Sequence, residues 1–201
     1  MIREVVNRHD QLMFHIVGDR SVGKLLDLME KMKIDWKPLC PRFEHADKIG
    51  YLPKYLEQVK RMGITVIENP TNFSENFPAI SKTSPFDMAV KTLLLKGIPL
   101  GIRSDGPFNP FPNIMFAVSH PRQPSEAISR EEAVIAYTVT NAFAEFEEQN
   151  KGTLTVGKVA DLAVLSQDIF EIPVPALQQT KTVLTMVNGK IVYDAQVLKV
   201  K

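Results

Sequence analysis

Short apolar runs alternate, up to Asp105, with longer segments in which apolar residues recur every three or four positions. The runs predict strands over residues 11–15, 64–67 and 98–104, and one that ends at His45. Strands that alternate with helices favour an α/β fold, a parallel sheet of about four strands with right-handed crossovers. The intervening segments predict helices, whose apolar stripes would face that sheet: Val22, Leu25, Leu26, Met29 and Met32 in one, and Leu52, Tyr55, Leu56, Val59 and Met62 in the next.

The pattern is different after Asp105. Ser129 and Glu132 have the spacing of a capping box, which predicts the start of a long helix that runs past residue 143. The stretch before this helix is rich in proline, which predicts a long loop, and a loop of this kind is expected to shape a substrate pocket. Its prolines are Pro107, Pro110, Pro112, Pro121 and Pro124.

A third pattern begins near Gly152, where short β-rich runs replace the helical periodicity. Strands are expected over residues 160–165, 183–187 and 191–193, and the Asn188-Gly189 dipeptide between the last two is a strong hairpin signal. We therefore expect two domains. Residues 1–150 would form the βα part and residues 151–201 a C-terminal β subdomain.

Composition limits the size and the partners of the protein. The 201 residues are 44% hydrophobic, which is typical of a globular chain, but a complete eight-stranded βα barrel needs roughly 250 residues. The 24 basic and 23 acidic residues are interspersed and give a net charge of +1, so we expect no nucleic acid partner. Because the chain has one cysteine, Cys40, an internal disulfide is excluded.

No apolar stretch reaches the roughly 20 residues that span a bilayer, and the first eight residues are too polar for a signal peptide. No membrane association is therefore expected, and a cytoplasmic location is the default expectation. A longer parent protein would carry its targeting sequence upstream, and Met1 itself could reflect a misplaced start.

Three potential metal ligands, His15, His45 and Asp105, each end or follow a predicted strand. Residues at the carboxyl ends of parallel strands converge on one face of the sheet. Taken alone, each histidine is more often a hydrogen-bonded core residue than a ligand, and an aspartate before Gly106-Pro107 is commonly a turn former. His9 and His120 are expected on the surface or in loops.

The motifs HIVGDRSV, RFEHADKI and RSDGPFNP contain these three residues. With the segments SREEAVIAYTVTNAF, KGTLTVGKVADLAVLSQDIF and GKIVYD, they resemble the metal-dependent amidohydrolase superfamily, in particular family 3 enzymes similar to N-substituted formamide deformylase. The resemblance places the motifs on the fifth, sixth and eighth strands of a TIM-type barrel. The first-strand His-x-His and the bridging residue of the fourth strand have no counterpart. The resemblance thus implies a carboxyl-terminal half barrel with an incomplete β-sandwich.

The same resemblance implies a hydrolase for non-peptide carbon–nitrogen bonds in small amide or formamide substrates. A divalent metal, zinc by expectation, would be bound by His15, His45 and Asp105, and Asp105 would also transfer protons. Arg103 stands where a small residue is expected. With part of the site missing, we expect the isolated chain to be weakly active or inactive.

A non-catalytic remnant that serves as an oligomerisation or binding module is the alternative function. In either case an open half barrel would expose two strand edges and the apolar residues of its interior. The expected partners are therefore a second copy of the chain or a separately encoded amino-terminal half.

Overall fold

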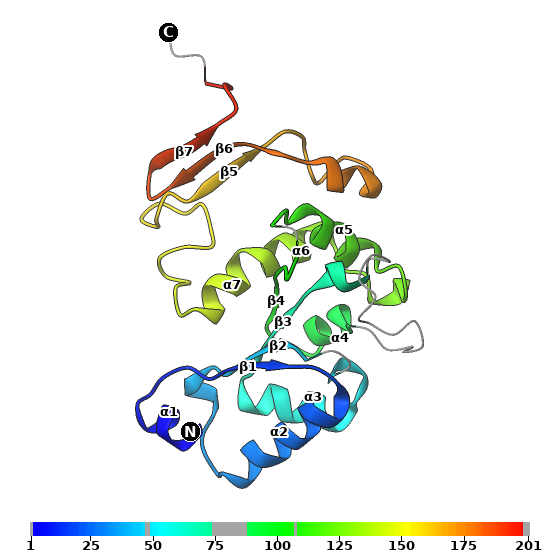
Figure 1. Cartoon of the computed structure of the whole chain (residues 1–201), viewed down its shortest axis with the longest axis vertical. Helices are drawn as coiled ribbons and strands as arrows, with labels where there is room; N and C mark the ends of the chain where they lie inside the picture. Colours follow the sequence, from blue (N-terminus) through cyan, green and yellow to red (C-terminus); the bar gives the residue numbers. More distant parts are fainter. Residues whose placement is uncertain (1, 47–48, 74–87, 107, 199–201) are drawn as a thin grey trace.

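A computed structural model describes residues 2–46, 49–73, 88–106 and 108–198. Its first sheet is parallel and has the strand order β1-β2-β3-β4 (Figure 1). This sheet confirms the α/β class and the four parallel strands expected from the alternating pattern. The strands are β1 (Met13–Ile16), β2 (Arg42–His45), β3 (Thr65–Glu68) and β4 (Leu100–Ile102).

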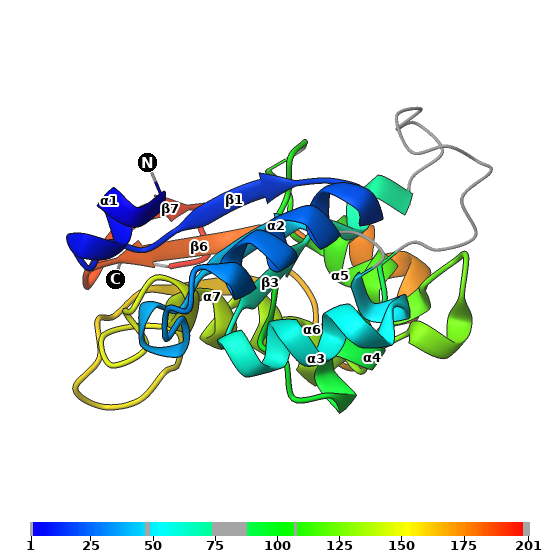
Figure 2. The same cartoon turned by 90° about the horizontal axis from the view of Figure 1, so that it is seen from below.

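Helices connect these strands as the apolar stripes predict. Helix α2 buries Val22, Leu26 and Met29, and α3 begins with Pro53 in its first turn, where the missing N–H of proline has no helical partner to lose. Figure 2 shows α2 and α3 running side by side along the sheet. The helices of this part are α1 (Ile2–Asn7), α2 (Asp19–Lys31), α3 (Pro53–Met62) and α4 (Val90–Leu95), with 3₁₀ turns at Lys37–Leu39, Ile49–Tyr51 and Pro70–Phe73. The sequence predicts a polar loop from the end of the third strand, at Asn69-Pro70, to about Pro85, and most of this stretch lies outside the described residues.

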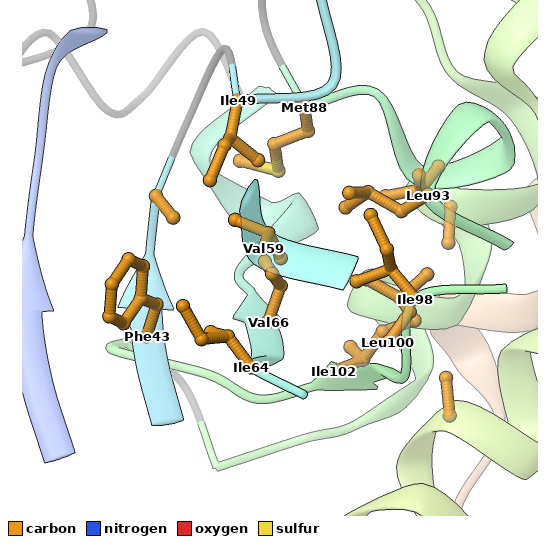
Figure 3. Packing of buried hydrophobic residues seen from close by; sticks show 14 of the residues in the cluster. Phe43, Ile49, Val59, Ile64, Val66, Met88, Leu93, Ile98, Leu100 and Ile102 are labelled. Carbon is orange, nitrogen blue, oxygen red and sulfur yellow. The ribbon is translucent and has the colours of Figure 1, made fainter. Parts of the chain in front are cut away.

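The main core lies between the sheet and these helices. Phe43, Val66 and Leu100 are aligned across β2, β3 and β4, and all three side chains are almost fully buried. Val59 of α3 and Leu93 of α4 pack against them (Figure 3). Burying each such side chain contributes roughly 1.5–3 kcal/mol of transfer free energy, so this layer fixes the position of the sheet.

On β1, the face that points away from the helices is open to solvent. Met13 is 61% exposed and Val17 53% exposed, whereas Phe14 and Ile16 pack on the core. An exposed apolar face is what the half-barrel expectation requires of β1.

The half barrel is also expected to expose the other edge of the sheet, at β4. The structure differs, because helices cover this strand. Leu100, Gly101 and Ile102 are all buried, and α6 and α7 pack against them. Asn141 Nδ2 donates to the outward-facing carbonyl of Ile102 at 2.8 Å. The prediction of two exposed edges was therefore wrong for β4.

The proline-rich stretch contains a helix that the sequence interpretation missed, α5 (Phe111–Ser119). Pro112 lies in its first turn, where proline favours a helix start. Asn109 Oδ1 accepts a hydrogen bond from Phe111 N at 3.0 Å, and Phe111 and Ile114 are buried. Prolines therefore do not mark a loop throughout this stretch, because Pro112 marks a helix start. The short 3₁₀ turn Pro124–Glu126 follows.

The capping box is confirmed, since Ser129 Oγ accepts from Glu132 N and Glu132 accepts from Ser129 N. The long helix is split into α6 (Arg130–Tyr137) and α7 (Val139–Ala144). Thr138 Oγ1 donates to the carbonyl of Val134 at 2.7 Å, a bond known to bend helices, and its backbone lies at φ −120°. In the part of the chain that the structure describes, no helix is both long and apolar enough to cross a bilayer.

The second sheet is antiparallel, in the order β5-β6-β7, and lies apart from the first (Figure 1). Asn188 and Gly189 both have positive φ and form the predicted hairpin turn. Every residue of β7 is exposed. The elements are β5 (Leu162–Leu165), β6 (Thr182–Val187), β7 (Lys190–Asp194) and the 3₁₀ segment Val174–Gln179.

Part of this C-terminal region joins the first core. Leu177 is fully buried and Ile169 is 7% exposed, and both belong to the main hydrophobic cluster. Arg130 Nη1 of α6 donates to the carbonyl of Ile169 at 2.7 Å. The division into domains at residue 150 remains a prediction.

Candidate metal centre

The candidate ligands His15 and His45 lie side by side at the carboxyl ends of β1 and β2. Their ring centroids are 4.6 Å apart and the rings meet edge to face at 72°. His15 is exposed and shares the open face of β1 with Met13. The two strands therefore bring the two predicted histidines into contact.

His45 reaches this face through an unusual backbone conformation. Glu44 pairs with His15 in the sheet register, so strand alternation would turn the next side chain toward the helices. His45 instead has φ +72°, a left-handed conformation that histidine adopts more readily than most residues. The result is that Glu44 and His45 are both buried and both contact the same group, Arg103.

Asp105 follows β4 and completes the contact with β2. Its Oδ2 lies 2.9 Å from His45 Nε2, and its side chain is 32% exposed. Asn69 is buried, lies just after β3 and stabilises the backbone at Asp105. With its amide oriented to satisfy its neighbours, its oxygen accepts from Asp105 N at 3.2 Å.

Charged side chains contact one another and two of these ligands. Arg103 Nη2 lies 2.7 Å from His45 Nε2 and 2.8 Å from Asp105 Oδ1. Arg103 Nε lies 2.9 Å from Glu44 Oε2, close enough for an ion pair although neither atom makes a well-directed hydrogen bond there. The other oxygen of Glu44 accepts from Arg42 Nε at 2.6 Å. The buried Glu44 carboxylate is thus held between two arginines.

Burial lowers the pKa of His45, and the positive charge of Arg103 lowers it further, against the opposing effect of Asp105. A neutral ring is also what Arg103 requires, because a guanidinium only donates and Nε2 must accept. The neutral ring then places its bare Nε2 against Asp105 Oδ2, another acceptor. Protonating Nε2 would satisfy Asp105 but would set an N–H against Arg103. One proton cannot satisfy both contacts.

Two electron-pair donors that face each other without a proton between them are suited to a cation. Imidazole and carboxylate are ordinary ligands of zinc and similar ions. The structure does not, however, assemble a complete set. Among the residues it describes, no group of three or more His, Cys, Asp or Glu side chains lies close enough to hold a metal. His45 and Asp105 fit part of a coordination sphere, and His15 contacts the ring of His45 without completing a group of three ligands with them.

Sequence reasoning missed Glu44 and Asn69. A charged residue next to a histidine inside an apolar strand was the available signal for Glu44. Asn69 stands before Pro70, and this pair indicates only the end of a strand. His120 does follow a helix in a loop, as expected, but it is fully buried, with Nε2 2.8 Å from the carbonyl of Met88. It has a structural role.

A cavity of about 810 Å³ lies apart from these ligands, between helices α5 to α7 and the second sheet. Pro110, Phe111 and Ile114 from the proline-rich stretch line it, beside Tyr137 and Asn141. None of the three candidate ligands is among its lining residues. The role of the proline-rich stretch in a substrate pocket stays a prediction.

Comparison with known sequences agrees with the motifs. The profile of the amidohydrolase family matches residues 1–193. YtcJ of Bacillus subtilis (strain 168) is 29% identical over 96% of this chain, and LONG AFTER FAR-RED 3 of Arabidopsis thaliana is 29% identical over 91%. The chain spans only 39% and 34% of these two proteins. The N-substituted formamide deformylase of Arthrobacter pascens is 28% identical over 52% of the chain, which spans 21% of that enzyme.

Solved structures show the same relationship. An uncharacterized metal-dependent hydrolase from Pyrococcus furiosus is 26% identical with a TM-score of 0.62, over 74% of this chain and 31% of its own. An adenosine deaminase from Xanthomonas campestris, solved with bound zinc, has a TM-score of 0.73 over 98% of this chain and 48% of its own, and at 14% identity it shows the fold alone. With a family profile that covers nearly all of its length and a partial barrel that places the motif residues together, the chain belongs to the amidohydrolase family.

Proposed function

We propose that this chain supplies the carboxyl-terminal part of a metal-dependent hydrolase for carbon–nitrogen bonds other than peptide bonds. The observation that carries the proposal is the 2.9 Å approach of His45 Nε2 to Asp105 Oδ2, beside the ring of His15. Relatives named as a formamide deformylase and as a metal-dependent hydrolase support the chemistry. A small N-substituted amide or formamide is the proposed substrate.

In this proposal His15, His45 and Asp105 hold a divalent cation, zinc in the first place. Such an ion lowers the pKa of a bound water to about 7 and polarises a carbonyl oxygen. Asp105 is partly exposed beside His45, so its carboxylate is placed to take a proton from the attacking water and to deliver it to the leaving nitrogen. The neutral state of His45, favoured by burial, gives Nε2 a lone pair that the cation would take over from Arg103 Nη2.

The remaining ligands and the remaining barrel come from outside this chain. The chain spans well under half of the relatives named above, and β1 has an open apolar face next to His15. We propose that an amino-terminal half, upstream in the same protein or separately encoded, pairs with β1 and completes the site. Pairing of two copies of the chain is the competing outcome.

The test is the metal content of the purified 201-residue chain after incubation with zinc, measured by elemental analysis. The expected result is about one zinc per chain, lost when His15 and His45 are both replaced by alanine. His9→Ala is the matched control, because His9 is an exposed histidine in the turn after α1, and it should leave the zinc content unchanged. Zinc retained by the double variant would overturn the ligand assignment.

One observation favours the second candidate, a non-catalytic oligomerisation or binding module. Arg103 contacts both His45 and Asp105, and a site already occupied by an internal cation has no need of a metal. A well-folded chain that binds no zinc, but forms a stable complex through β1, would establish this function instead.

A further inference from the structure

Arg103 does more than neutralise Glu44. Its Nε faces that carboxylate, which would be enough for charge balance, but its Nη2 extends to His45 Nε2 at 2.7 Å and Asp105 Oδ1 at 2.8 Å. One guanidinium nitrogen thus contacts both the imidazole lone pair and the carboxylate that are suited to a metal. The side chain is 28% exposed, so it has a route to solvent.

The charges of the cluster balance with Arg103 in place. Arg42 and Arg103 contribute two positive charges and Glu44 and Asp105 two negative charges, while His45 Nε2 faces the Arg103 guanidinium, which can only donate, as a neutral acceptor. Adding a divalent cation would leave an excess of two positive charges in a partly buried site, which is electrostatically costly. The excess would fall if Arg103 turned toward water.

We propose that Arg103 is a built-in cation that competes with a divalent metal for His45 and Asp105. An ion bound to both ligands would use the His45 Nε2 lone pair to which Nη2 now donates, so the guanidinium has to leave before the ion can bind. Arg103 would then set the metal affinity of the chain. The inference rests on the proposed function, because it assigns the same two ligands.

The experiment is a titration of the 201-residue chain with Co²⁺, followed by its visible absorption, with dissociation constants for unaltered protein and for Arg103→Ala. We expect the Co²⁺ dissociation constant to fall at least tenfold in the variant, which corresponds to about 1.4 kcal/mol. Arg103→Lys keeps the positive charge, so its Co²⁺ dissociation constant should return most of the way to that of the unaltered protein. Arg103→Gln, neutral and of similar length, replaces the alanine variant if that protein does not fold.

Arg42→Ala is the matched control. It removes the other positive charge on Glu44, and no contact of Arg42 with His45 or Asp105 is present among the described residues. Equal tightening in Arg42→Ala and Arg103→Ala would overturn the proposal, since net charge alone would then explain it. Histidine-dependent Co²⁺ binding that Arg103→Ala leaves unchanged would also overturn it while sparing the proposed function. Absence of Co²⁺ binding in every variant would overturn both.

Discussion

Replacing Glu44 by glutamine tests whether the charged cluster stabilises the fold around the site. The Glu44 side chain is only 5% exposed, and its carboxylate lies 2.6 Å from Arg42 Nε and 2.9 Å from Arg103 Nε. Glutamine preserves the shape and one acceptor oxygen. It removes the charge that balances the two arginines and sets an NH2 donor against one of them, so the change tests the loss of the charge together with one acceptor.

The expected loss follows from the geometry. Breaking a fully buried ion pair costs about 3–5 kcal/mol, and a hydrogen bond to a charged group contributes about 1.5–3 kcal/mol. Arg42 and Arg103 are 20% and 28% exposed, so water can partly solvate them once the carboxylate is gone. The contact with Arg103 also lacks a good hydrogen-bond direction. We therefore expect a loss within the lower of these two ranges, about 2 kcal/mol in the free energy of unfolding.

Urea unfolding followed by circular dichroism measures this loss. With a slope of about 2 kcal/mol per molar urea, the midpoint of Glu44→Gln should fall by about 1 M. Glu57→Gln, an exposed substitution of the same chemistry on α3, should change stability by no more than about 0.5 kcal/mol. A Glu44→Gln midpoint as high as that of the control would refute the reasoning.

Two further predictions concern single residues of the same sheet. Folding lowers the pKa of His45 below its usual 6.5, so near and below this pH the folded chain binds fewer protons than the unfolded chain. The free energy of unfolding should therefore decrease as the pH drops below about 6.5. In His45→Asn, the urea midpoint should decrease less steeply over the same drop in pH. A Cβ at Gly101 would lie 2.4 Å from Asn141 Oδ1 and 2.5 Å from Ile67 Cδ1, so Gly101→Ala should lower the free energy of unfolding by about 1–3 kcal/mol, whereas Gly97→Ala, which meets no neighbour, should show no steric cost beyond that of its own positive φ.

The strands and the candidate ligands could be predicted because their signals are local. An apolar run that ends in a polar residue marks the end of a strand, and parallel topology then brings those ends together without any knowledge of the contacts. His15 beside His45, and His45 beside Asp105, follow from this rule. The hairpin turn at Asn188 was predictable for the same reason, because two residues with positive φ determine it.

The arrangement of the charged cluster could not be predicted, because it depends on one backbone angle and on strand register. Alternation along β2 places Glu44 and His45 on opposite faces, and the positive φ of His45 removes that separation. The pattern of apolar residues carries no information about this angle. The sequence identifies Arg103 only as a residue that stands where a small one is expected, because its partners Glu44 and His45 lie about 60 residues away on another strand.

The asymmetry of the sheet edges links the fold to the proposed partner. The carbonyl of Ile102 on the outer edge of β4 is already bonded to Asn141, and α6 and α7 cover the strand. Adding a strand there would require these helices to leave, and their buried contacts would be lost. On β1, the face that carries His15 also carries Met13 and Val17 and is apolar and exposed. We therefore predict that a segment that extends the sheet joins at β1, so that any ligand it brings would arrive on the side of His15.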